Sequence, residues 1–78
     1  MTKIYKYNEY TYWVTVDPTI HETTGQTYFI AYVSDQEPSG LFYGASVRGP
    51  DGKILLFETE LSALTNGNLV KQSELGRK

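Results

Sequence analysis

The chain has 78 residues, of which 40% are hydrophobic and 21% charged, and its formal net charge is −2. This length predicts a single small β-rich domain over residues 1–78, and the mild acidity argues against a protein whose main task is to grip phosphate backbones. The sequence holds no cysteine and one histidine. Disulfides are therefore excluded, and we expect neither a metal site nor a cofactor.

Residues 1–10 lack the apolar region of a signal peptide. The longest apolar run, residues 28–33, is far too short to cross a bilayer. We therefore expect a cytoplasmic protein with no membrane partner.

Four of the seven tyrosines flank the dipeptide Asn8-Glu9 symmetrically, and they are Tyr5, Tyr7, Tyr10 and Tyr12. A two-residue hairpin turn at this dipeptide would pair the tyrosines across two strands and place all four rings on one face. The competing interpretation is a bulge in one long bent strand. We predict the turn, and we call the predicted hairpin of residues 3–16 the first ribbon.

Proline lacks the N–H that a strand ladder uses, so Asp17-Pro18 predicts the end of the second strand. The polar residues 19–26 predict a loop. Residues 27–34 are apolar on both faces, which is typical of a central or covered strand. Residues 35–40 predict a turn.

A hairpin is predicted from residues 41–48 and 53–59 around Gly49-Pro50-Asp51-Gly52, a sequence typical of a type I turn. Its expected register puts Val47 near Ile54, Ala45 near Leu56, and Gly44 beside Phe57.

Residues 60–65 predict a helix of one to two turns, with Thr59 as its N-cap and Asn66-Gly67 as its C-cap. We expect Leu61 or Leu64 to close the core, while residues 68–75 fit a strand or a second short helix. The predicted fold class is mainly β (β-rich α+β), with about five antiparallel strands in a meander or small half-barrel and one short C-terminal helix. The alternative is a more complete small barrel.

The one histidine, His21, lies near Asp17 and Glu22 and is the candidate general base of an enzyme. We find no nucleophile at matching spacing and no glycine-rich phosphate loop. We therefore interpret His21 as a solvated loop residue, assign no catalytic residue and predict that the protein is not an enzyme.

The candidate partner-binding residues are Tyr5, Tyr7, Tyr10, Tyr12 and Trp13. The tyrosines form either the core and its rim or an exposed platform whose wetter end is Tyr7 and Tyr10. Trp13 is either an exposed anchor or, as we favour, a residue covered by the C-terminal segment. We predict a non-enzymatic protein-interaction module, such as a small adaptor, inhibitor or accessory subunit that binds another protein. The alternative is a single-stranded nucleic-acid binder that stacks bases on the tyrosines.

A mostly β chain leaves strand edges that can pair with other chains. Lys3, Lys6 and Lys53 are the only basic residues placed to blunt such edges here. We therefore expect a homodimer through the edge of the first ribbon or its tyrosine face, with Tyr7 and Tyr10 partly buried between subunits.

Overall fold

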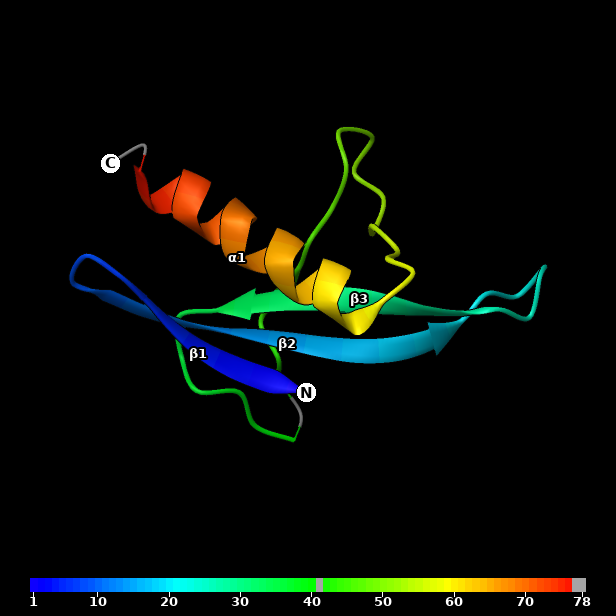
Figure 1. The fold of residues 1–78 in the computed structure, drawn as a ribbon, viewed down its shortest axis with the longest axis horizontal. Helices are drawn as coiled ribbons and strands as arrows, with labels where there is room; N and C mark the ends of the chain where they lie inside the picture. Colours follow the sequence, from blue (N-terminus) through cyan, green and yellow to red (C-terminus); the bar gives the residue numbers. More distant parts are fainter. Residues whose placement is uncertain (41, 77–78) are drawn as a thin grey trace.

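The computed structural model describes residues 1–40 and 42–76. Four antiparallel strands form one sheet in the order β1-β2-β3-β4, and the helix α1 crosses one face of it (Figure 1). The strands are β1 (Thr2–Tyr7), β2 (Tyr10–Ile20), β3 (Thr27–Ser34) and β4 (Ala45–Ser46), and α1 is Glu60–Gly76. The predicted mainly β class is confirmed, with four strands in place of about five.

The two-residue turn at Asn8-Glu9 is confirmed. Tyr7 pairs with Tyr10 and Tyr5 with Tyr12 across the first ribbon. Asn8 has a φ of 57°, in the left-handed region that asparagine tolerates better than most residues. A bulge in one long strand is therefore ruled out.

The predicted end of β2 at Asp17-Pro18 is wrong, because β2 pairs with β3 as far as Ile20. The reason is the direction in which the backbone N–H and C=O groups point at position 18. In β2, the even-numbered residues point these backbone groups toward β1, as the hydrogen bond from the Val16 N–H to the Met1 carbonyl shows. No described segment lies beside Pro18 on that side, because the pairing of β1 with β2 reaches no farther than Met1 and Val16. The missing N–H of Pro18 therefore costs no ladder bond.

Two separate segments share the position beside β3. The Val47 N–H donates to the Ala31 carbonyl, and farther along the strand Phe57 and Phe29 exchange both backbone bonds. Between these points, residues 48–56 leave the sheet as an arm that rises on the α1 side (Figure 1). The two full strands predicted for residues 41–48 and 53–59 are therefore wrong within the described residues, and Leu41 lies outside them.

The turn of this arm is confirmed, but its register differs by one residue from the prediction. The Gly52 N–H donates to the Gly49 carbonyl, while Arg48 rather than Val47 lies opposite Ile54. Gly44 has a φ of 102°, and a Cβ there would lie 2.2 Å from the Val33 carbonyl oxygen. Gly44 thus allows its own segment to approach the backbone of β3 closely, and its predicted place beside Phe57 is wrong.

The predicted C-cap at Asn66-Gly67 is also wrong, because α1 continues through both residues to Gly76. Residues 68–75, which fitted a strand or a helix, are helical. The predicted N-cap is confirmed, since the Thr59 Oγ1 accepts a hydrogen bond of 3.0 Å from the Ser62 N–H.

Gly67 packs against the sheet instead of ending the helix. A Cβ at this position would lie 2.7 Å from Cγ1 of Val14 and 3.4 Å from the Cβ of Ala31. The glycine therefore lets α1 approach β2 and β3 more closely than any other residue would allow. The buried apolar residues on both sides of this contact form the core: Tyr12, Val14, Val16, Ala31, Val47, Ala63, Leu64 and Leu75.

Replacing Gly67 by alanine should destabilise the fold, although alanine favours helices by about 1 kcal/mol over glycine. The added methyl group meets Val14, and overpacking of this kind costs about 1–3 kcal/mol. With the gain in helix propensity subtracted, we expect Gly67→Ala to lower the free energy of unfolding in urea by up to about 2 kcal/mol.

Gly76→Ala is the matched control, because among the described residues a Cβ there would approach only the Tyr7 hydroxyl, at an ordinary 3.6 Å. It should change stability by less than about 0.5 kcal/mol. A Gly67→Ala variant more stable than the wild type would contradict the close contact.

Candidate functional site

The tyrosine face of the first ribbon is the face that α1 covers. Tyr12 is fully buried, and its hydroxyl donates a hydrogen bond to Oδ1 of Asn68 on the helix. Tyr5 and Tyr7 are half-buried and pack against the core, whereas Tyr10, beside the turn, is 50% exposed. Three of the four tyrosines therefore belong to the core and its rim.

Tyr5 stacks on Tyr12 with 5.7 Å between the ring centroids. Burial, and to a lesser extent the neighbouring Tyr12, raises the pKa of the Tyr5 hydroxyl above its ordinary value. The hydroxyl is therefore neutral at physiological pH, which suits a packing role.

Trp13 lies on the opposite side of the sheet from α1, which we call the back face. It pairs with Ile4 as predicted, but the C-terminal segment does not cover it, because that segment forms α1 on the other face. Instead, residues 37–38 approach from the loop after β3. Trp13, Ile4, Thr2, Glu37 and Pro38 line a hollow of about 330 Å³.

The outer edge of β1 is the third part of the site. Met1 and Val16 exchange both backbone bonds, so alternation makes the odd-numbered residues of β1 the ones that bond to β2. The even-numbered residues Thr2, Ile4 and Lys6 then point their N–H and C=O groups away from the sheet. We call these groups the β1 edge, and no described segment pairs with them.

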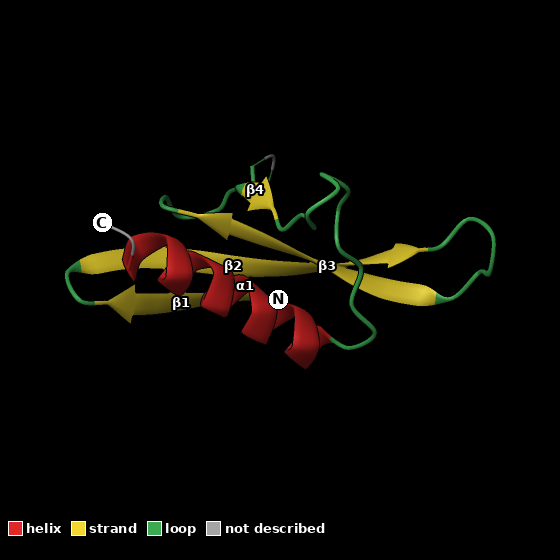
Figure 2. Cartoon of the chain, turned by 90° about the horizontal axis from the view of Figure 1, so that it is seen from above, coloured by secondary structure: helices red, strands yellow, loops and turns green. Residues whose placement is uncertain are grey.

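Figure 2 shows β1 along one side of the sheet and β4 along the other, with α1 in front. The two sides differ in how much pairing they can offer. β4 has only two residues, and Pro18 blunts the free side of β2 beyond β1. The β1 edge carries two lysines, Lys3 and Lys6, which blunt it in part. It holds no proline, so each of its outward-pointing residues keeps its N–H donor.

His21 takes part in the loop that joins β2 to β3. Its Nδ1 accepts hydrogen bonds from the backbone N–H groups of Thr23 and Thr24, at 3.2 and 3.4 Å. Its ring packs edge-on against Tyr28, with 5.8 Å between centroids. These contacts give His21 a role in shaping the loop.

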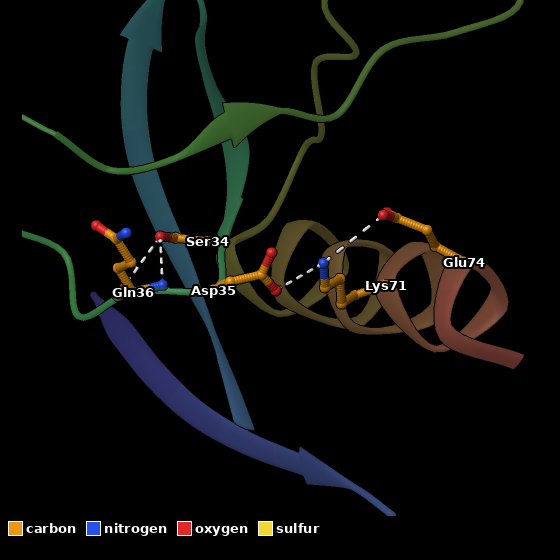
Figure 3. Close-up of polar contacts among 5 residues, drawn as sticks. All are labelled: Ser34, Asp35, Gln36, Lys71 and Glu74. Atoms are coloured by element: carbon orange, nitrogen blue, oxygen red, sulfur yellow. Dashed lines mark hydrogen bonds and ion pairs between the residues drawn. The ribbon is translucent and has the colours of Figure 1, made fainter. Parts of the chain in front are cut away.

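A polar cluster ties the C-terminal half of α1 to the end of β3 (Figure 3). The Lys71 ammonium lies 2.8 Å from Oδ1 of Asp35 and 3.7 Å from Oε1 of Glu74, and the lysine side chain is 9% exposed. Burial lowers the pKa of Lys71, but Asp35 and then Glu74 outweigh it, so that the pKa is raised above its ordinary 10.5. The cluster is a structural clasp for the helix.

Substituting Asp35 should lower the free energy of unfolding more than substituting Lys71. Asp35→Asn leaves a buried ammonium with a weaker partner, so we expect a loss of about 1–2 kcal/mol in urea unfolding. Lys71→Met leaves Asp35 in water and should cost less than about 1 kcal/mol.

The Lys71 contribution also has a pH signature. A raised folded-state pKa stabilises the protein below the unfolded-state pKa, near 10.5, and that stability is lost as the pH rises through the folded-state value. The stability difference between the wild type and Lys71→Met should therefore shift against the wild type above about pH 10.5. Equal losses from both variants, with no alkaline change, would contradict the clasp.

Two further properties of the described ranges bear on function. No group of three or more metal-ligating side chains is assembled in them, and none of their helices is long and apolar enough to cross a membrane. Comparisons of the chain with protein-family models, curated proteins and solved structures find no match. The site must therefore be judged by its own geometry.

Proposed function

We propose that this chain is a non-enzymatic protein-interaction module that binds an extended segment of another protein along the β1 edge. The observation that carries the proposal is a row of backbone groups at Thr2, Ile4 and Lys6 with which no described segment pairs. A strand added there gains main-chain hydrogen bonds, which is a recurring way to bind peptides.

The surroundings of the edge favour certain side chains in the partner. Side chains of an added strand alternate between the two faces, and those on the back face meet the hollow beside Ile4 and Trp13. An apolar side chain suits the part of this hollow that Ile4 and Trp13 form. Lys3 and Lys6 favour a segment with acidic residues elsewhere, because opposite charges steer the encounter and fix the register. Such a module acts as an adaptor, an inhibitor or an accessory subunit.

The alternative, base stacking on the tyrosines, draws less support from the arrangement of the rings. Stacking needs exposed ring faces, but Tyr12 is fully buried and Tyr5 and Tyr7 pack against the core. Of the five candidate residues, Trp13 is next to the hollow, and Tyr10 is the most accessible tyrosine of the ribbon. We therefore retain protein binding as the proposal.

Affinity capture with cross-linking from native lysate tests this function when it is run with two matched variants. Ile4→Glu places a charge in the middle of the β1 edge. Ile20→Glu changes a residue of the same type that is 69% exposed, against 59% for Ile4, at the other end of the sheet. We expect the wild type and Ile20→Glu to capture the same protein, and Ile4→Glu to recover at least about tenfold less.

Two results would overturn the proposal. The first is that the wild type captures no protein. The second is that Ile4→Glu captures the same protein as efficiently as the wild type does.

A further inference from the structure

We infer that the β1 edge also pairs with a second copy of this chain, antiparallel and in a register centred on Ile4. The inference rests on the proposed function in one respect, namely that the β1 edge accepts an added strand. It goes further in naming the strand and its register.

The positions of the unpaired groups make the edge complementary to itself. Thr2, Ile4 and Lys6 are evenly spaced about Ile4, so a two-fold axis there pairs Ile4 with Ile4 of the second copy and Thr2 with Lys6 of the second copy. All three residues then lie in hydrogen-bonded pairs, which gives three pairs of two bonds each. A register shifted by two residues keeps only two such pairs, so the centred register is preferred.

The back face of the joined sheet would become more apolar at its centre. Residues directly opposite each other share a face, so the two Ile4 side chains meet there. Each is 59% exposed in the single chain and has Trp13 as its cross-strand neighbour. The pairing thus creates a continuous row of two isoleucines between two tryptophans.

The lysines of the edge do not oppose each other in this register. Lys3 lies opposite Tyr5 of the second copy, and Lys6 lies opposite Thr2 of the second copy. Like charges placed directly opposite would destabilise the pair, whereas a lysine beside a tyrosine ring is favourable. The four lysines still raise the local positive charge, so added salt should strengthen this pairing. An acidic partner would instead bind more weakly in salt.

The two helices lie on the same face of the joined sheet, because the two-fold axis is perpendicular to it. On α1, Val70 and Glu74 face a hollow shared with Val33, Ala45 and Val47, on the β4 side. Asn68 reaches Tyr12, and Leu61 lies two turns earlier on the same side of the helix. Leu61 is 71% exposed and is therefore placed on the side from which the second copy approaches.

The size of the contact sets its strength. One strand with its flanking side chains buries less than the roughly 1,200 Å² of most stable complexes. We therefore expect a dissociation constant in the micromolar range, on the order of 10–100 µM. Because self-pairing and partner binding use the same edge, each excludes the other.

A charge-complementation experiment tests the register directly. Ile4→Glu and Ile4→Lys each bring two like charges together at the axis, so each variant alone should be a monomer near 8.8 kDa by light scattering at about 200 µM. A one-to-one mixture places glutamate opposite lysine and should restore the dimer that the wild type forms. Ile20→Glu, the matched control, should remain dimeric.

Cross-linking gives an independent measurement, because the chain has no natural cysteine. Ile4→Cys should form a disulfide-linked dimer, since paired residues have Cα atoms about 5.5 Å apart. Lys6→Cys should not, because the Cα atoms of the two copies of residue 6 are about 14 Å apart in this register.

Three outcomes would overturn the inference. A wild-type monomer at about 200 µM would do so, as would a dimer that Ile4→Glu and Ile4→Lys leave intact. A dimer that Ile4→Glu strengthens would mean that residue 4 faces Lys6 in a shifted register. None of these results contradicts the capture of a lysate protein that depends on Ile4. The proposed function and this inference can therefore fail separately.

Discussion

The close contact of α1 with the sheet at Gly67 is the constraint on which the rest of the structure depends. Because residue 67 has no Cβ, the helix packs directly on Val14 and Ala31 and closes the core over this face of the sheet. This packing of α1 places Tyr12 under Asn68 and makes most of the tyrosine face part of the core. The remaining opportunities for recognition are the back face and the β1 edge.

Short-range signals in the sequence predicted much of the fold. The turn at Asn8-Glu9, the strand Thr27–Ser34 and the cap at Thr59 each follow from a few neighbouring residues. The failures all depended on tertiary contacts. Pro18 lies within a strand because β1 does not extend beside it, so no hydrogen bond is lost there. Gly67 lies within a helix because it packs on β2. Residues 48–56 form an arm because Phe57 returns to pair with Phe29.

The candidate site was predicted only in part, for the same reason. Tyr5, Tyr7, Tyr10 and Tyr12 were correctly placed on one face, but no local pattern showed that α1 would cover that face. Trp13 was expected under the C-terminal segment, whereas residues 37–38 approach it from the loop. The direction of the edge groups, however, was available from the sequence. A two-residue turn after Tyr7 already fixes the even-numbered residues of β1 as the ones that point outward.

Amide hydrogen exchange along β1 tests the central claim, that the even-numbered backbone groups form the binding edge. In dilute monomer the amides of Tyr5 and Tyr7 should be protected by β2, while those of Ile4 and Lys6 should exchange at nearly the rate of an unstructured chain. Raising the protein concentration, or adding a captured partner, should protect Ile4 and Lys6 selectively. If both amides stayed unprotected while the protein was demonstrably bound, the β1 edge would not be the interaction site.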